Sequence, residues 1–222
     1  MSALPMTQFH PDQFLLNDYA AGSLAGAIAL PIAVHLEYCS RCRGESRQLE
    51  ALGAQLFDEL DPVPVGEDAL ERVMQRLEGK MPVLASTSGR RTLDGLPRVL
   101  RTLVPDSLDA LEWKRLGSLR TTRLRFGDAA REVALHQITA GGKVLEHGHS
   151  GTEITVVLSG RFSDQEGLYQ RGDFLVRGPD DVHRPVAAED GDCLCLAVLD
   201  GPIRFAGLLG RIANPFLRIH PR

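Results

Sequence analysis

Two groups of histidine, cysteine and glutamate residues have the composition and spacing of metal-ligand sets. One belongs to a motif G-x5-H-x-H-x3-E-x6-G between Gly141 and Gly160. Together with a histidine that follows a Gly172-Asp173 turn, it offers His147, His149, Glu153 and His183. The other group, near the N-terminus, consists of His10, His35, Cys39 and Cys42. Three imidazoles and a carboxylate suit zinc, iron, manganese or nickel, whereas mixed sulfur and nitrogen ligands suit zinc.

The cysteine-containing group has the spacing of a zinc site at a helix end. His35 and Cys39 are four residues apart and would share one helix face, and Cys42 stays close to that face. A tetrahedral site needs a fourth ligand, and His10 is the only other histidine or cysteine in the first 130 residues. The alternative is a core histidine beside two free thiols. The register of His35 favours the metal, which would also stabilise a small domain.

The histidine-rich group is expected on β-strands. His147 and His149 are two residues apart, so on one strand both side chains face the same side, which we predict to be a barrel interior. Glu153 begins the next apolar segment, and His183 lies on a later strand. We therefore expect ligands from three strands to converge at one mouth of a small barrel.

The first part of the chain is predicted to form four helices. Pro11-Asp12 suits the first turn of one helix, and Pro31 allows a second helix to begin there. Leucines spaced by three and four residues from Leu49 to Leu60 predict a third, which Pro62 ends. A fourth, short helix is predicted over Asp68–Leu77.

The later part of the chain changes to an alternating pattern typical of a small antiparallel sandwich or barrel. The clearest predicted strands are Thr121–Phe126, Glu132–Thr139, Glu153–Leu158 and Leu194–Leu199. His136 falls within the second of these and is expected to be a structural or surface residue. His220 lies in the tail.

A segment rich in glycine, proline and serine separates the two patterns and is predicted to be a flexible linker. The chain is therefore predicted to be multidomain, α then β. We expect a helical domain over residues 1–79, a linker over 80–97 and a barrel domain over 98–222.

The charge is distributed unevenly along the chain. Residues 1–80 carry six Lys or Arg against twelve Asp or Glu, a net charge of −6, whereas the rest carries +2. An acidic N-terminal part argues against nucleic-acid binding there and suits a basic protein partner. The longest apolar stretch, Leu24–Val34, is shorter than the ~20 residues of a membrane-spanning helix. Four cysteines in two close pairs favour metal-ligating thiolates in a reducing cytoplasm, so we expect a cytoplasmic protein without a signal peptide.

Both ligand motifs resemble those of known families. His35-x3-Cys39-x2-Cys42 is similar to the core of the zinc-binding anti-sigma domain, a four-helix unit whose upstream histidine ligand matches His10. Many members have a proline after the first cysteine, where this chain has Ser40, a difference expected to alter the turn but not the ligands. The longer motif matches the first motif of the cupin superfamily over its whole length. The second motif, which ends at His183, lacks the usual glycine and is one residue shorter.

Further segments resemble the C-terminal domain of ChrR-type anti-sigma factors. These are Trp113, residues 160–164, 167–169, 172–174 and 183–185, and the pair Cys193 and Cys195. The resemblance covers nearly the whole chain, with both ligand sets in the right order. It implies an N-terminal four-helix zinc anti-sigma domain and a C-terminal cupin β-barrel, with zinc as the metal of both sites.

The resemblance also implies a function. The chain would sequester an extracytoplasmic-function sigma factor in the cytoplasm. It would release this sigma factor when singlet oxygen or an organic hydroperoxide acts on the metal-binding cupin domain. No contact with nucleic acid or membrane and no enzymatic activity are expected. The main alternative is a metal-dependent cupin enzyme such as a dioxygenase, in which iron or manganese activates oxygen. A cupin-containing DNA-binding regulator is a third, disfavoured by the acidic N-terminal part and the lack of a clear helix-turn-helix.

Cys193 and Cys195 are also two residues apart, so both thiols face one side of their strand. The simpler interpretation is a pair of small core residues, which is common for buried cysteine. The alternative hypothesis is a redox-responsive pair near the metal.

Overall fold

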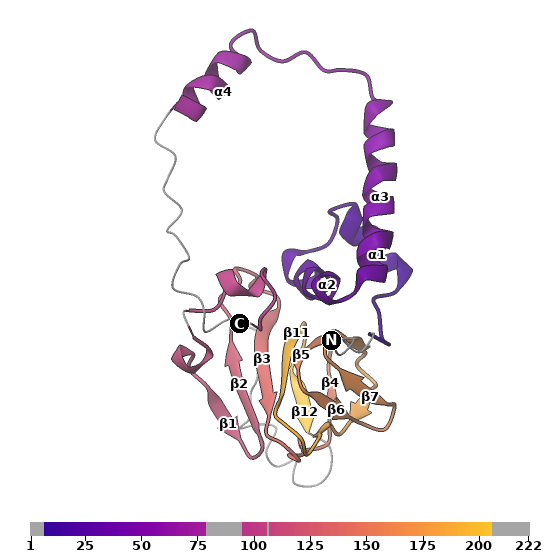
Figure 1. The fold of residues 1–222 in the computed structure, drawn as a ribbon, viewed down its shortest axis with the longest axis vertical. Coiled ribbons are helices and arrows are strands. Elements are labelled where there is room, and N and C mark those ends of the chain that lie inside the picture. The colour runs from indigo at the N-terminus through magenta and orange to yellow at the C-terminus, as the bar shows by residue number, and fades with distance from the viewer. Residues whose placement is uncertain (1–6, 79–94, 106, 206–222) are drawn as a thin grey trace, which may run out of the picture.

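The computed structural model describes residues 7–78, 95–105 and 107–205. Within these ranges a helical part precedes a β-rich part, which confirms the predicted fold class (Figure 1). Residues 80–94 of the predicted linker and His220 lie outside the described residues.

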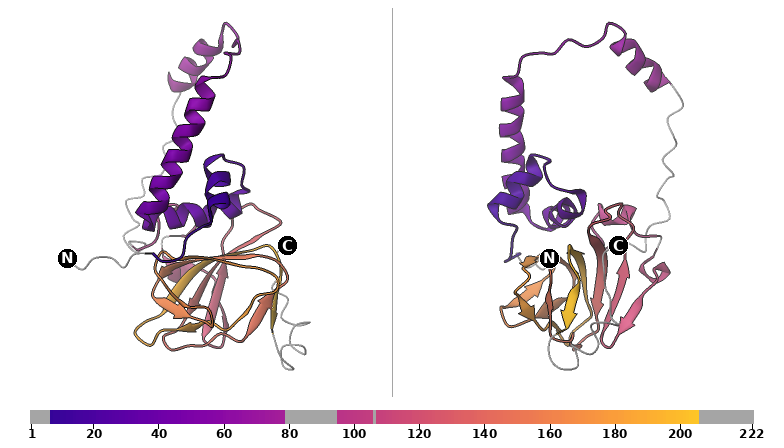
Figure 2. Two further views of the ribbon diagram at one scale, coloured as in Figure 1. Left: turned by 90° about the vertical axis from the view of Figure 1, so that its right-hand side faces the viewer. Right: turned by 180° about the vertical axis from the view of Figure 1, so that it is seen from behind.

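Four α-helices come first in the described chain, as predicted. They are α1 (Gln13–Ala20), α2 (Gly26–Tyr38), α3 (Ser40–Asp58) and α4 (Ala69–Glu78). Asp12 begins α1, because its carboxylate accepts a 2.8 Å hydrogen bond from the backbone N–H of Leu15. In Figures 1 and 2, α1 and α2 lie over one side of the β-rich part, α3 projects away from it, and α4 lies apart from both.

Helix α2 begins earlier than the sequence indicated. The prediction placed its start at Pro31, but the helix starts at Gly26 and Pro31 lies inside it. A proline in a helix interior removes one backbone hydrogen bond. Ala27, Leu30 and Ile32 are buried on the same helix, and this apolar burial offsets the lost bond. Tertiary packing therefore overrides the local preference of proline for a first turn.

Helix α3 follows α2 after a single residue, Cys39. The extended backbone of Cys39 ends α2 and begins α3, and its sulfur accepts the backbone N–H of Cys42 at 3.4 Å. The predicted third helix thus starts directly at the cysteine motif. Leu52, Leu56 and Phe57, in the second half of α3, are exposed.

Strands and two short 3-10 helices make up the β-rich part. They are η2 (Leu100–Thr102), η3 (Leu108–Ala110), β1 (Lys114–Leu116), β2 (Leu119–Arg123), β3 (Glu132–Ile138), β4 (His147–His149), β5 (Glu153–Ser159), β6 (Arg161–Ser163), β7 (Leu168–Gln170), β8 (Phe174–Arg177), β9 (Val182–His183), β10 (Val186–Ala187), β11 (Cys193–Leu199) and β12 (Ile203–Phe205). One sheet has the order β1-β2-β3-β11-β5-β8, and two smaller sheets have the orders β10-β6-β7 and β12-β4-β9. Together they form the barrel in Figure 1.

The four predicted strands correspond to β2, β3, β5 and β11, with small shifts at their ends. Strand β11 pairs antiparallel with both β3 and β5, and every residue in it is buried. A strand buried on both faces explains why its sequence is continuously apolar rather than alternating.

The helices and the barrel share one apolar core. Helix α2 packs against β5, β8 and β11. Leu16 and Ile32 from the helices belong to the same buried cluster as Val156 and Leu196 from the strands. This packing fixes the first three helices relative to the barrel.

None of the helices in the described ranges combines the length and apolar character needed to cross a bilayer.

Candidate metal sites

The first candidate site lies where α1, α2 and α3 meet. His10 precedes α1, His35 is in the last turn of α2, Cys39 joins α2 to α3, and Cys42 is in the first turn of α3. The four potential ligand atoms all lie within 4.8 Å of one another. The structure thus brings together all four residues that the sequence singled out, although they come from three separate segments.

The distances in this cluster suit tetrahedral coordination. Nδ1 of His10 lies 3.4 Å from Nε2 of His35, 3.5 Å from Sγ of Cys39 and 3.4 Å from Sγ of Cys42. A tetrahedron with zinc–nitrogen and zinc–sulfur bonds of about 2.0–2.3 Å has edges of about 3.3–3.8 Å. The three distances from His10 therefore match the edges of a zinc tetrahedron.

His35 is held in the tautomer that ligation requires. Its Nδ1 lies 2.6 Å from the carbonyl oxygen of Gly172 in the barrel, so this nitrogen donates its hydrogen and leaves Nε2 with a free lone pair facing the cluster. Burial lowers the pKa of His35 to about 4, which keeps the ring neutral near pH 7.

The two thiols of the site differ in acidity. Burial opposes ionisation of Cys39, but hydrogen bonds led by the backbone N–H of Cys42 outweigh it and lower the pKa of Cys39. Burial, followed by the charge of Cys39, raises the pKa of Cys42 to about 12. Cys39 therefore ionises more easily than Cys42, and binding of zinc would displace the proton of Cys42.

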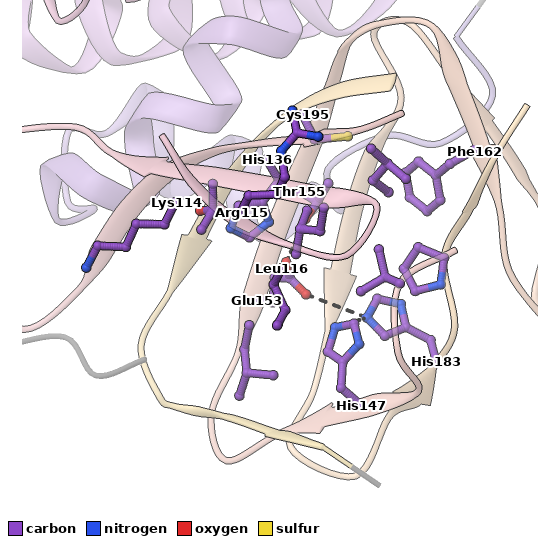
Figure 3. A pocket seen from close by; sticks show the side chains of 16 residues that line it. Lys114, Arg115, Leu116, His136, His147, Glu153, Thr155, Phe162, His183 and Cys195 are labelled. Atoms are coloured by element: carbon purple, nitrogen blue, oxygen red, sulfur yellow. Dashed lines mark hydrogen bonds and ion pairs between the residues drawn. The ribbon is translucent and has the colours of Figure 1, made fainter. Parts of the chain in front are cut away.

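The second candidate site lies inside the barrel. His147 and His149 are the two ends of β4, Glu153 begins β5 and His183 ends β9, so the ligands come from three strands as expected. Their potential ligand atoms also lie within 4.8 Å of one another. Figure 3 shows the rings of His147 and His183 side by side, with Glu153 of β5 facing them.

Three imidazole nitrogens and one carboxylate oxygen face a common point in this site. Nε2 of His183 lies 3.1 Å from Nε2 of His147 and 3.3 Å from Nε2 of His149. Oε2 of Glu153 lies 3.0 Å from Nε2 of His149 and 3.8 Å from Nε2 of His183. Nδ1 of His147 lies 2.8 Å from the carbonyl oxygen of Leu145 and donates to it, which places the lone pair of the ring on Nε2, the atom that faces His183. Converging lone pairs of this kind fit a cation.

The charge states in the barrel site also suit a metal. Burial, followed by the neighbouring His183, lowers the pKa of His147 to about 4. Burial opposes ionisation of Glu153, but the hydrogen bond with His149 outweighs it, so the pKa of Glu153 lies below its usual range. Neutral imidazoles and an ionised carboxylate are the forms that bind metal.

A cavity of about 300 Å³ lies beside the barrel site (Figure 3). Glu153, His147 and His183 line it together with His136 and Cys195. His136 is half-buried, so it faces this interior rather than the surface. Its position two residues before Ile138, which also lines the cavity, is the sequence signal that could have placed it there.

Cys193 and Cys195 are both buried, and their sulfur atoms are 3.7 Å apart. The hydrogen bond with Cys193 and burial raise the pKa of Cys195 well above its usual value. In the resting structure this thiol is therefore protonated and reacts slowly.

Comparison with known proteins identifies the family. The model of the ChrR cupin-like domain matches residues 106–203. The anti-sigma-E factor ChrR of Cereibacter sphaeroides is 36% identical over 211 residues, which cover 95% of this chain and 98% of that protein. The chain belongs to the ChrR family of anti-sigma factors.

A solved structure agrees with this ChrR-family assignment. The crystal structure of Rhodobacter sphaeroides SigE in complex with the anti-sigma ChrR matches with a TM-score of 0.75 and 33% identity, over 87% of this chain and all of the matched chain. Both matched proteins are anti-sigma factors, which are regulators.

Sequence reasoning missed the groups that orient the ligands of this ChrR-family chain. The carbonyl oxygens of Leu145 and Gly172 are backbone atoms, which no side-chain motif reveals. Asp164, whose carboxylate lies 3.4 Å from Nδ1 of His183, is nineteen residues away in the chain. Asp164 and the Gly172-Asp173 turn fall within segments that resemble ChrR-type anti-sigma factors, but that resemblance gave them no role at either site.

Proposed function

We propose that this chain is an anti-sigma factor that sequesters an extracytoplasmic-function sigma factor and releases it on an oxidative signal. The family assignment supports this, because the matched ChrR structure is a complex with SigE. We further propose the division into a sigma-binding domain over residues 1–79, a linker over 80–97 and a sensing cupin domain over 98–222.

The observation that carries the proposal is the apolar surface of α3 and α4. Leu52, Leu56 and Phe57 on α3 are 54–72% exposed. On α4, exposures of 48–73% are found for the side chains of Leu70, Val73, Met74 and Leu77. The spacing of these four residues places them along one face of the helix, yet α4 has no buried residue. Apolar faces left in water mark surfaces for a protein partner.

The chemistry of the partner follows from the charge of this part of the chain. Residues 1–80 carry a net charge of −6, so a partner with a basic surface would be attracted to them. A sigma factor, whose polymerase- and promoter-binding surfaces are masked by such domains in the anti-sigma family, fits this requirement. The chain itself would then touch neither nucleic acid nor membrane, and would act in the cytoplasm.

We propose zinc as the metal of both sites, with iron, manganese or nickel as alternatives in the barrel. In the helical site, an ion bound by His10, His35, Cys39 and Cys42 would fix the start of α3 relative to α1 and α2. Because the binding energy of a structural zinc is folding energy, loss of this ion would loosen the sigma-binding helices.

The barrel would act as the sensor. Its ligands His147, His149, Glu153 and His183 adjoin a cavity that can admit a small oxidant such as singlet oxygen or an organic hydroperoxide. Oxidation of ligands or loss of the ion would then release the sigma factor. Thiols become reactive only when their pKa falls, so Cys195 would contribute after the barrel site has been disturbed.

Coexpression with the extracytoplasmic-function sigma factor of the same organism tests the proposal. We expect a stable complex that contains zinc, that blocks binding of the sigma factor to core polymerase, and that dissociates when an organic hydroperoxide or a singlet-oxygen source is added. A metal-loaded chain that binds no sigma factor would contradict the proposal. Oxygen uptake by the iron-loaded chain with an organic acid would instead support the dioxygenase alternative.

A further inference from the structure

A single turn of the barrel contacts the segments that carry both histidines of the helical site. The carbonyl oxygen of Gly172 lies 2.6 Å from Nδ1 of His35. The neighbouring carboxylate of Asp173 accepts hydrogen bonds from the backbone N–H groups of Gln8 at 2.7 Å and Phe9 at 3.2 Å. Phe9 directly precedes His10. One turn, remote in sequence, therefore contacts one histidine and the approach to the other.

The turn is fixed by the barrel and packed tightly against the helices. Gly172 has a φ of +93°, and its N–H donates to the carbonyl of Val157 at 2.8 Å. The second carboxylate oxygen of Asp173, a fully buried residue, accepts the N–H of Gln170 at 2.8 Å. A Cβ atom added at Gly172 would lie 2.5 Å from Cγ2 of Thr7 and 2.9 Å from Cβ of Tyr38. Glycine is thus required both by the backbone and by the close approach of the helical part.

We propose that the Gly172-Asp173 turn positions His10 and His35, so that the metal affinity of the helical site is set in part by the barrel. The inference rests on the proposed binding of a metal by the helical site and goes beyond it. The hydrogen bonds of the turn reach His35 and the residues before His10, whereas the segment of Cys39 meets the turn through the packing of Tyr38. A shift of the turn therefore acts first on the two nitrogens of the site. Groups that orient metal-binding histidines typically change metal affinity by about 10- to 100-fold when they are lost.

The same contacts lead back to the barrel site. The ring of Phe9 lies 4.8 Å from the ring of Tyr169, whose hydroxyl donates to Asp164 at 3.0 Å. The other carboxylate oxygen of Asp164 lies 3.4 Å from Nδ1 of His183. A rearrangement at His183 therefore has a continuous path of packed and hydrogen-bonded groups to the residue next to His10. Such a path gives the sensing domain a direct mechanical connection to the helical site.

Cobalt substitution of the full chain separates the two sites. Sulfur-to-cobalt charge-transfer absorption can arise only at a site with thiolate ligands, and its loss in Cys42→Ser assigns it to the helical site. The barrel site has only nitrogen and oxygen ligands and is followed by its visible d–d bands. Competition with a chelator then gives the cobalt affinity of each site in the same sample.

Two variants change the turn, and a third serves as a matched control. Asp173→Asn removes the charge that holds Gln8 and Phe9, and Gly172→Ala pushes against Thr7 and Tyr38. Gly141→Ala also places an L-residue at positive φ, here +65°, but its Cβ would meet only Glu189, at 3.7 Å. We expect the two turn variants to weaken cobalt binding at the helical site about tenfold or more, with little change in Gly141→Ala.

Equal affinities of the helical site in the turn variants and in Gly141→Ala would overturn the inference. If a turn variant also loses the barrel bands, Phe9→Ala decides, because it loosens the segment before His10 while leaving Gly172 and Asp173 unchanged. An unchanged cobalt affinity of the helical site in Phe9→Ala would then overturn the inference. If the wild-type protein shows no charge-transfer bands, the helical site does not bind the metal, and the proposal on which this inference rests is wrong. If the wild-type protein shows the bands but no turn variant lowers the cobalt affinity of the helical site, only the role of the turn is contradicted.

Discussion

Oδ2 of Asp164 lies 3.4 Å from Nδ1 of His183, while the same carboxylate oxygen accepts a 2.9 Å hydrogen bond from Arg177. Asp164 thus orients a ligand of the barrel site and is itself held by a largely buried guanidinium. A carboxylate that hydrogen-bonds the second nitrogen of a metal-binding histidine fixes the ring and raises its basicity.

Replacing Asp164 by Asn should therefore weaken metal binding in the barrel by about tenfold. Chelator competition on the purified chain measures this affinity. Glu166→Gln is the control, because the carboxylate of Glu166 also pairs with Arg177 but forms no hydrogen bond or ion pair with His183 in the described part of the chain. If both variants lower the metal affinity of the barrel site equally, the effect comes from the loss of a partner of Arg177 rather than from the orientation of His183.

Leu56→Asp should abolish or strongly weaken sigma-factor binding without changing stability. The side chain is 57% exposed in the unbound chain, so a charge there costs little in folding, but it would be buried unpaired in the complex. We expect an affinity loss of about tenfold or more. Copurification and titration with the sigma factor measure it. Leu168→Asp, on a similarly exposed residue of β7, should bind normally. Equal losses in the two variants would argue against α3 as the docking surface.

The stability of the metal-free chain should fall as the pH drops from about 6.5 to about 4. Burial lowers the pKa of His147 from 6.5 to about 4, so in this interval the unfolded chain binds a proton that the folded chain does not. The free energy of unfolding then rises with pH by up to about 1.4 kcal/mol per pH unit for this group. Thermal unfolding of chelator-treated wild type and His147→Gln tests this. An identical pH slope in both proteins would contradict the assignment.

Replacing Cys193 and Cys195 by Ser should blunt the response to hydroperoxide without abolishing sigma binding. Their sulfur atoms are 3.7 Å apart, and two residues on one strand place their Cα atoms about 6.6 Å apart, near the upper limit for a disulfide. Dissociation of the sigma complex with added hydroperoxide is the measurement. If the response to hydroperoxide is unchanged, Cys193 and Cys195 serve only as core residues. Cys42→Ser, which removes a helical-site ligand, should instead weaken the complex before any oxidant is added.

Much of the organisation followed from local pattern. Short apolar segments between turn residues located β3, β5 and β11, and helical spacing located α3 and α4, because both signals depend on the pattern of one short segment. The start of α2 was wrong, since burial of the helix against the barrel outweighs the preference of Pro31 for a first turn. The apolar stripe of α4 predicted the helix, but only the structure places that stripe in solvent.

The sequence by itself determined the ligand sets, because the chemistry of a metal site restricts which residue types occur and at which spacing. It identified His35, Cys39 and Cys42 by their spacing, and His147 and His149 from one strand register. The expectation of a single helix for the first three was wrong, because α2 ends at Tyr38 and Cys42 lies on α3. Only the tertiary structure decided how these residues are oriented and how the two sites are connected. The carbonyl of Gly172 and the carboxylate of Asp164 act across long sequence separations, and such contacts arise from folding of the whole chain rather than from any local pattern.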